Sequence, residues 1–354
     1  MSVRRIGLDI GATAVRMVEV EFSNKNSAVS GRGTVVAFGQ ASVPRGAVQS
    51  GEVRDVASVS SAIKRAHGAG KFSTKEVQIG VAAGSVAVRE MELPSLPMED
   101  LRRSLPFQVQ EVLPMSTDEA LVDFFPTSER QVEGRSLLRG ILVAAPKSIV
   151  SQNIMAVQSA GFRPTMVDLN AFALLRAQMT DELRGDVVAL VDIGSKVTNV
   201  IIVQQGVPRL VRTLPAGGQD VTDAVSGALH VDPEEAENIK ASVGMGGGSA
   251  GGEQHPAQPM IADTTRSLVE SIRNTFVFYS GNNPGANIGR VVLTGGGALL
   301  PGLGQYLATS SRLSVNYGNA LSRVNVSKKI AKATMAYQET RIPIAVGLAF
   351  GEAS

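Results

Sequence analysis

The sequence contains no cysteine and no tryptophan, and only three histidines (His67, His230 and His255) in 354 residues. Without cysteine there can be no disulfide, no thiol nucleophile, no iron–sulfur cluster and no thiolate zinc site. The histidines lie far apart in the chain, which argues against a histidine metal cluster. The lack of cysteine also fits a reducing compartment, and we expect a cytoplasmic protein.

Excess charge and long apolar runs are scarce as well. The chain has 34 basic and 32 acidic residues, a formal net charge of +2, so no overall field favours nucleic acid or an anionic membrane. The longest apolar run, 342–350, includes a proline and is too short to span a bilayer. No signal-peptide pattern is present at the N-terminus. We therefore expect neither nucleic-acid binding nor direct membrane insertion.

An internal repeat is the most informative feature that the sequence does have. The segment 6–13 (IGLDIGAT) returns as 189–196 (ALVDIGSK), and each copy is flanked by runs rich in β-branched residues. This pattern predicts a strand, a tight glycine turn and an antiparallel return strand, rather than a strand-to-helix phosphate loop. A period of about 180 residues is too long for a solenoid and indicates two similar domains facing each other across a cleft.

The remaining periodicity predicts a mixed α/β chain. Strands are expected at 34–38, 77–81, 87–93, 138–144 and 291–294, and helices at 53–66, 99–112, 148–160, 233–240, 261–279 and 344–350. Asp232 is the expected N-cap of the helix that starts at Pro233, because acidic residues follow in its first turn.

These elements suggest a division into domains. We expect a first domain over 1–185 with a proline-rich inserted subdomain at about 84–161. A second domain is expected over 186–340, with a subdomain at about 228–285 and a flexible glycine-rich loop at 244–259. The residues 341–354 are expected to form a C-terminal helix that packs back on the core.

The glycine turns also predict a ligand. In an Asp-x-Gly hairpin, glycine lets the backbone approach a phosphate, adjacent N–H groups donate to its oxygens, and the aspartate can hold hydrated Mg²⁺. A third glycine turn, Gly295–Gly297, follows an apolar strand and suits a flat ligand such as a nucleoside. A single Asp-x-Gly hairpin is more often a plain tight turn than a phosphate site, and the third segment taken alone is equally compatible with a plain turn.

In this order, two phosphate hairpins followed by a glycine turn, the sequence resembles the actin-like ATPases, a superfamily that includes actin, sugar kinases, the seventy-kilodalton chaperones and FtsA. Within it the chain is most similar to the PilM family of type IV pilus assembly proteins, over essentially its whole length. The segments that carry the resemblance are 9–19, 192–199, 216–222, 235–240 and 293–298, with 111–114 and 118–123 in the insertion. The resemblance implies an α/β fold of duplicated actin-like, ribonuclease H-like domains around a nucleotide cleft, with the extra subdomain shared by FtsA and PilM.

The resemblance also implies ATP and Mg²⁺ as ligands and assigns residues to them. Asp9 and Asp192 would hold Mg²⁺ through water. The residues implied in nucleotide binding are Asp9, Gly11, Ala12, Thr13, Arg16, Gly194, Ser195, Gly217, Gly218, Glu237, Lys240, Gly295, Gly296, Gly297 and Ala298.

Two of the implied residues bear on hydrolysis. Asp168 falls where the superfamily keeps the acid or amide that positions the attacking water, although an aspartate before an apolar helix is also a common N-cap. Arg16 stands where related members commonly carry lysine; it keeps the charge but loses the compact ammonium. We therefore expect at most a slow ATPase.

The function implied by the resemblance is a cytoplasmic ATP-binding platform or adaptor protein of type IV pilus assembly. Its expected partners are the N-terminal cytoplasmic segment of a PilN-like inner-membrane protein, other pilus platform proteins and further copies of itself. That segment would also hold it at the inner face of the membrane. The alternatives are an FtsA-like cell-division filament protein, disfavoured because no basic amphipathic tail follows residue 351, and a small-molecule kinase, for which no sugar-binding motif is present near Asp168.

Overall fold

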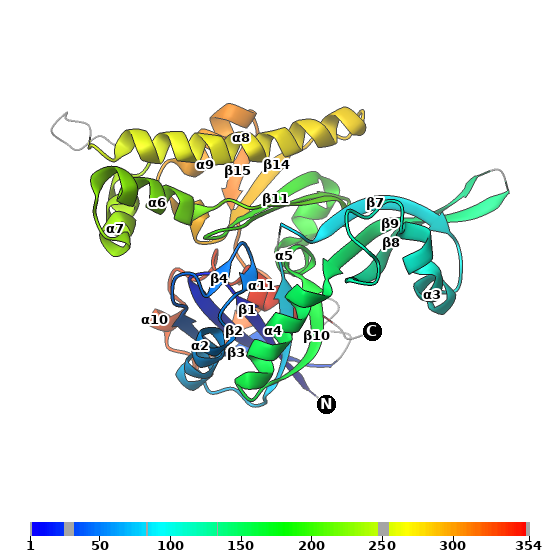
Figure 1. Cartoon of the computed structure of the whole chain (residues 1–354), viewed down its shortest axis with the longest axis horizontal. Coiled ribbons are helices and arrows are strands. Elements are labelled where there is room, and N and C mark those ends of the chain that lie inside the picture. The colour runs from blue at the N-terminus through cyan, green and yellow to red at the C-terminus, as the bar shows by residue number, and fades with distance from the viewer. Residues whose placement is uncertain (1, 25–31, 83, 133, 247–254, 352–354) are drawn as a thin grey trace.

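Two large β-sheets, a three-stranded sheet and a two-stranded sheet form in the described part of the protein (Figure 1). The structure is a computed structural model, and it describes residues 2–24, 32–82, 84–132, 134–246 and 255–351. Residues 247–254 of the expected glycine-rich loop lie outside the described residues, as does the end of the chain at 352–354. Among the described residues, no helix combines the length and apolar character needed to cross a lipid bilayer.

The first sheet has the strand order β10-β6-β1-β2-β3-β16 and contains the first repeat copy. Its strands are β1 (Val3–Ile10), β2 (Ala14–Phe22), β3 (Gly33–Ser42), β6 (Glu76–Val81), β10 (Arg163–Leu169) and β16 (Val324–Val326). Helices α2 (Val56–Ala69) and α4 (Lys147–Ser159) pack against it through one apolar cluster. Helix α11 (Pro343–Ala349) packs on β1 and β2 through another cluster, and all seven of its residues are buried.

The second sheet has the order β13-β12-β11-β14-β15 and contains the second repeat copy. Its strands are β11 (Val187–Ile193), β12 (Thr198–Gln204), β13 (Val207–Leu214), β14 (Arg290–Thr294) and β15 (Ser314–Tyr317). Helices α6 (Gly218–Leu229), α7 (Pro233–Val243), α8 (Gln258–Asn282) and α9 (Leu303–Ser311) share one apolar cluster with it. Helix α5 (Asn170–Gln178) contributes to a second cluster and contacts β6 and β10 as well as β11 and β12, so it joins the two sheets.

A smaller three-stranded sheet projects from this pair of sheets at one end (Figure 1). It has the order β7-β9-β8, with β7 (Ala87–Pro94), β8 (Ala120–Val132) and β9 (Arg135–Pro146), and it is covered by α3 (Met98–Val109). Its core is a separate cluster that contains Leu101, Leu105 and Phe124. The remaining elements are β4 (Val48–Gln49), β5 (Glu52–Val53), α10 (Lys332–Met335) and the 3-10 helices η1 (Asp181–Gly185) and η2 (Gly297–Leu299).

Most of the elements expected from the sequence are confirmed. Both repeat copies form antiparallel hairpins, β1 with β2 and β11 with β12, and the expected strands are present with longer bounds. The helix expected at 53–66 begins three residues later, at Val56, because the Asp55 side chain accepts the Ser58 backbone N–H and caps the helix there. Asp232 caps α7 as expected, since its carboxylate accepts the backbone N–H groups of Glu234 and Glu235.

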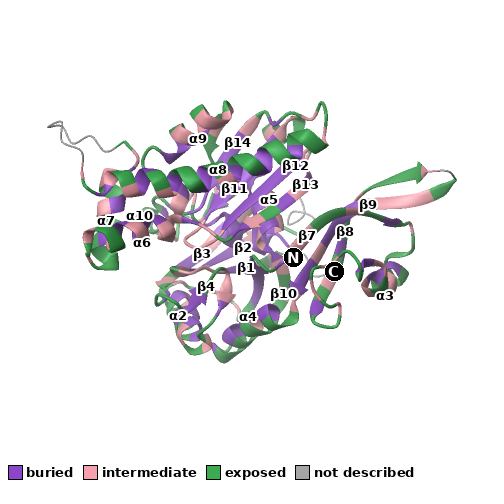
Figure 2. Ribbon diagram, turned by 45° about the horizontal axis from the view of Figure 1, so that its top comes forward, coloured by how far each residue is buried: buried purple, intermediate pink, exposed green. Residues whose placement is uncertain are grey.

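The sequence did not predict β8, β10, β13, β15, β16 or α6. The expected domain bounds stay predictions. Strand β16, which lies within the expected second domain, pairs with β3 in the first sheet. The burial pattern in Figure 2 shows the strands of the two large sheets as the most continuously buried part of the molecule.

Candidate functional site

The two hairpins repeat the same local geometry. In the first, Gly11 donates its backbone N–H to the carbonyl oxygen of Ala14 at 3.1 Å, and in the second Gly194 donates to that of Val197 at 2.9 Å. A Cβ on either glycine would crowd that carbonyl oxygen, so the turn depends on glycine. Each hairpin therefore presents a tight turn with an aspartate one residue before the end of its first strand.

Those aspartates, Asp9 and Asp192, are buried and lie close enough to affect each other. Burial raises the pKa of the Asp9 carboxyl to about 6; Arg16 opposes this shift and Asp192 adds to it. Burial likewise raises the pKa of Asp192, although a 2.8 Å hydrogen bond from the Thr294 hydroxyl lowers it. A cation placed beside them would therefore stabilise the ionised form of both carboxylates.

Arg16 faces Asp9 across the first hairpin, as its register partner. Burial lowers its pKa and the charge of Arg341 adds to this shift, whereas the charges of Asp9 and Asp192 oppose it. Its Nε atom is buried with no hydrogen-bond partner among the described residues. A buried guanidinium with an unused donor is poised to bind an anion. The two hairpins thus hold incompletely compensated charges of both signs, which an Mg²⁺–phosphate ligand would compensate together.

The Gly217–Gly218 segment contacts the second hairpin directly. Gly218 donates its N–H to the Gly194 carbonyl at 2.9 Å, and Gln219 donates to that of Ser195 at 2.8 Å. A Cβ on Gly217 would lie 2.5 Å from the Gly194 oxygen, so only glycine allows this approach. Helix α6 therefore starts directly on the second hairpin.

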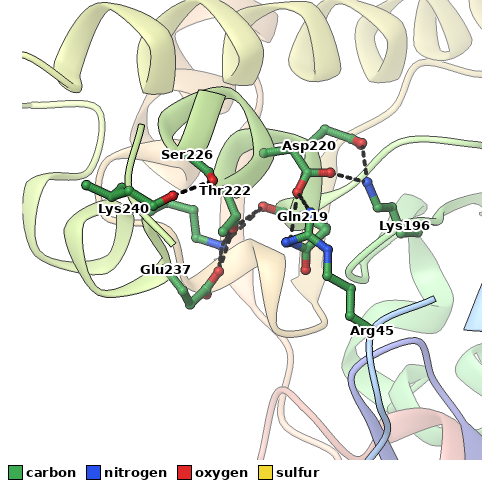
Figure 3. A network of polar contacts seen from close by, with 11 residues as sticks. Arg45, Lys196, Gln219, Asp220, Thr222, Ser226, Glu237 and Lys240 are labelled. Atoms are coloured by element: carbon green, nitrogen blue, oxygen red, sulfur yellow. Dashed lines mark hydrogen bonds and ion pairs between the residues drawn. The ribbon is translucent and has the colours of Figure 1, made fainter. Parts of the chain in front are cut away.

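Glu237 and Lys240 lie on α7, one turn apart, and point toward α6 (Figure 3). The Lys240 ammonium donates to the Gly218 carbonyl at 3.1 Å, the Thr222 hydroxyl at 2.9 Å and Glu237 Oε2 at 2.6 Å. Lys240 is nearly buried, whereas the Glu237 side chain is 54% exposed. Lys240 is thus held beside the glycine segment, and Glu237 remains open to solvent on one side.

The third glycine turn completes the group. Gly295 has φ +88°, and its N–H donates to the Thr340 carbonyl at 2.7 Å. A Cβ on Gly218 would lie 3.2 Å from Gly297 Cα, so this turn adjoins the start of α6. A Cβ on Gly296 would meet no atom within 4 Å, while Ala298 is buried in the core. Of the three glycines, Gly296 has the open surface that a bound base would need.

Asp168 lies apart from this group, at the end of β10, two strands away from β1. The N-cap of α5 is Leu169 without any side-chain hydrogen bond, so the alternative that Asp168 caps this helix is wrong. Instead, its carboxylate is paired with Arg176 of α5 and accepts the Leu169 N–H at 2.7 Å. The water-positioning role of Asp168 stays a prediction.

The structure also brings to the site side chains to which the sequence analysis assigned no role. Lys196, two residues after the glycine of the second hairpin, donates to Asp220 of α6 (Figure 3). It also donates to Asp223 of α6, which is paired with Arg45. Asn170, at the start of α5, has a buried Oδ1 with no partner among the described residues. The pairing of Lys196 and Arg45 with α6 joins residues distant in sequence, and no sequence pattern could have indicated it.

Duplicated glycine hairpins in two sheets joined by α5 define the class of this protein: it has the fold of the actin-like ATPases. The family model described as type IV pilus assembly protein PilM matches residues 7–353. The chain therefore belongs to the PilM family of type IV pilus assembly proteins.

Solved structures include chains with a similar fold. The chain of a PilM–PilN type IV pilus biogenesis complex has a TM-score of 0.84 at 23% identity, covering 98% of each chain. MreB 5 of Spiroplasma citri bound to AMPPNP has a TM-score of 0.52 at 12% identity, covering 97% of this chain and 94% of that one. These likenesses show the fold.

Curated relatives include the cell division protein FtsA. The FtsA of Bacillus subtilis (strain 168) is 23% identical over 263 residues, 68% of this chain. The chain spans 58% of the length of that relative. The FtsA of Borreliella burgdorferi is 25% identical over 339 residues, which are 84% of this chain and 80% of that protein.

Proposed function

We propose that this member of the PilM family is an ATP-binding adaptor that docks the N-terminal cytoplasmic segment of a PilN-like inner-membrane protein. The proposal of ATP binding rests on the arrangement of charges at the hairpins. Two buried carboxylates with raised pKa values lie beside a buried arginine with an unused hydrogen-bond donor. A nucleotide with Mg²⁺ supplies both missing charges.

Each part of the site has a role in this proposal. Asp9 and Asp192 hold Mg²⁺ through water. The turns at 11–13 and 194–195, with Arg16, take the phosphates. Gly217, Gly218, Glu237, Lys240 and residues 295–298 take the nucleoside.

Calorimetry with ATP and Mg²⁺ tests the nucleotide half. We expect the wild-type protein to bind, and Asp192→Ala to weaken binding at least tenfold because it removes a metal-orienting carboxylate. The exposed Asp118→Ala variant is the matched control and should bind like wild type. Equal affinity of Asp192→Ala and wild type would refute the site.

Turnover is expected to be slow, with ATP serving mainly to stabilise the closed arrangement of the two sheets. Asp168 is engaged by Arg176, and Arg16 replaces the compact lysine of related members. We expect a rate below about 1 per second, the low end of ordinary enzymes. A phosphate-release assay showing rapid turnover, or stimulation by a sugar, would instead favour a small-molecule kinase.

The edge of the small sheet supports the docking half. Strand β8 is an edge strand, so one side of its backbone is available for another strand. Along it Leu121 and Phe125, four residues apart on one face with Asp123 between them, are each nearly half exposed, and the ring centroids of Phe125 and Phe172 of α5 lie 5.4 Å apart. An extended peptide could pair with the backbone of β8 and place apolar side chains on this row.

A pull-down with the N-terminal peptide of a PilN-like protein tests this half. We expect wild-type protein to be retained and Phe125→Asp to lose most binding, because a charge would replace apolar contact area. Val277→Asp is the matched control, since Val277 is an exposed valine on α8 in the other half of the chain. Retention of Phe125→Asp at wild-type level would place the docking surface elsewhere.

An FtsA-like filament protein is the second candidate, favoured by the curated FtsA relatives. Self-association would then be the main activity. Sedimentation of the purified protein with ATP and Mg²⁺ separates the two candidates: abundant pelletable polymer without any partner supports the filament, and its absence supports the adaptor.

A further inference from the structure

Arg45 and Asp223 form an ion pair although they lie 178 positions apart in the chain. Arg45 belongs to the connection between β3 and β4. Two residues before it, Val43 donates its backbone N–H to the Thr13 carbonyl at 2.9 Å, so this connection is fastened to the turn of the first hairpin. Any movement of the first hairpin would therefore carry Arg45 with it.

Asp223 is fastened in the same way to the second hairpin. It lies one turn along α6 from Gln219, whose N–H donates to the Ser195 carbonyl. Its carboxylate is also bonded to the second hairpin through Lys196, whose ammonium donates at 2.7 Å. The Arg45–Asp223 pair thus links the two hairpins from opposite sides of the proposed nucleotide site.

Three donors share the Asp223 carboxylate, which makes this more than an isolated surface pair. Besides Arg45 and Lys196, the Gln219 amide donates to it at 3.0 Å, and Lys196 also donates to Asp220 at 3.1 Å (Figure 3). Partial burial raises the pKa of Asp223, but the hydrogen bonds from Lys196 and Gln219 and the charges of Lys196 and Arg45 outweigh it, so the pKa lies below its usual value. Asp223 is therefore ionised at neutral pH and held in one place.

We infer that the Arg45–Asp223 pair retains bound nucleotide, because the two hairpins must separate before the ligand can leave and that separation breaks the pair. The inference rests on the proposed nucleotide-binding function. Arg45 acts here as a positioning residue: it contacts α6 rather than any residue expected to touch the nucleotide. Its effect should fall on the rate of nucleotide release rather than on the affinity of the separate hairpins for phosphate.

The test is a chase experiment with the full chain. Protein loaded with a fluorescent ATP analogue and Mg²⁺ is mixed with excess ATP, and the release rate is followed in a stopped-flow instrument. We expect release from Arg45→Ala to be about two- to fivefold faster than from wild type, the range that partly exposed ion pairs provide. Arg45→Lys should fall between wild type and Arg45→Ala, and Arg45→Glu should release fastest because it places like charges opposite each other.

Arg54→Ala is the matched control. Arg54 is 59% exposed, compared with 53% for Arg45, and it also forms an ion pair, but with Glu52 in the same half of the chain. This variant should release nucleotide at the wild-type rate. Salt provides a second readout: screening should speed release from wild type and affect Arg45→Ala less. Urea unfolding of the nucleotide-free variants should show a loss of stability no larger than the change in release rate corresponds to, whereas general misfolding would cause a larger loss.

A double variant isolates the pair itself. Asp223→Asn also weakens the contact with Lys196, so on its own it should speed release at least as much as Arg45→Ala. Adding Arg45→Ala to Asp223→Asn should change the rate little, since the pair is already broken. Release from Arg45→Ala at the wild-type rate, with normal binding by wild type, would overturn this inference alone. Failure of wild type to bind nucleotide would overturn the proposed function and the inference with it.

Discussion

At the scale of single residues, the candidate site is defined by charges that lack adequate compensation. Asp9 and Asp192 are buried beside each other, and Arg16 has a buried donor without a partner among the described residues. Burying such groups costs free energy unless a ligand or a proton compensates them. The burial of these charged groups therefore lowers the stability of the ligand-free protein, and this loss can be measured.

The first prediction concerns Asp9 and pH. Its pKa is about 6 in the folded protein against 3.8 for the ordinary carboxyl, so the folded chain binds more protons between these values and the free energy of unfolding falls as pH rises from about 4 to about 6. Asp9→Asn removes this penalty. We expect the nucleotide-free variant to be more stable than wild type at pH 7.5, by on the order of 3 kcal/mol, and to lose this advantage near pH 4.

Urea unfolding at pH 4, 6 and 7.5 measures the difference, with exposed Asp118→Asn as the control. A stability difference that does not change with pH would show that the pKa of Asp9 is not raised in the folded protein.

At the scale of elements, neighbouring glycines in the turn at 295–297 have different roles. Gly295 adopts φ +88°, and a side chain there would collide with the backbone of Ile193, so this glycine is required by the fold. Gly296 has an ordinary helical conformation and open space at its Cβ position. Adjacent glycines in one turn thus separate into a folding role and a proposed binding role.

The second prediction compares these two glycines. Gly296→Leu should fold with a stability within about 0.5 kcal/mol of wild type, because its side chain enters open space. It should nevertheless weaken ATP binding at least tenfold by filling the place of the base. Gly295→Ala should lose more than about 1 kcal/mol of stability through backbone strain and collision. Thermal unfolding and calorimetry of both variants give the four values; tight ATP binding by Gly296→Leu would move the base elsewhere.

At the scale of the whole molecule, the two large sheets are joined by buried helices, and the small sheet is attached at one end. Helix α5 contacts strands of both sheets, and α11 packs against α5 and the first sheet. The small sheet has its own apolar core, and β8 is one of its edge strands. Nucleotide binding and partner docking are therefore proposed for different parts of one chain.

The third prediction concerns membrane attachment. If docking through a PilN-like partner is correct, the chain expressed alone should remain in the supernatant after cell fractionation. Co-expression with the partner should move it to the membrane fraction, and deletion of the partner's N-terminal cytoplasmic segment should return it. Persistent membrane association without a partner would contradict the adaptor and favour the FtsA-like candidate.

The sequence by itself determined the parts of this protein that depend on local interactions. The two Asp-Ile-Gly segments, 9–11 and 192–194, specify their hairpins because glycine is needed for the close turn and β-branched residues favour the flanking strands. Asp232 and Pro233 specify the start of α7 for similarly local reasons. The fold class followed from the resemblance of these segments, in this order, to the actin-like ATPases.

Only the tertiary structure decided which distant residues meet. Three contacts join elements whose sequences do not indicate that they meet. Arg45 pairs with Asp223, Asp168 pairs with Arg176, and β16 joins the first sheet. The raised pKa of Asp9 likewise depends on how completely the surrounding sheets exclude water. Periodicity reports which face of an element is buried, whereas contacts between side chains and the electrostatic field at a site depend on how all the elements pack together.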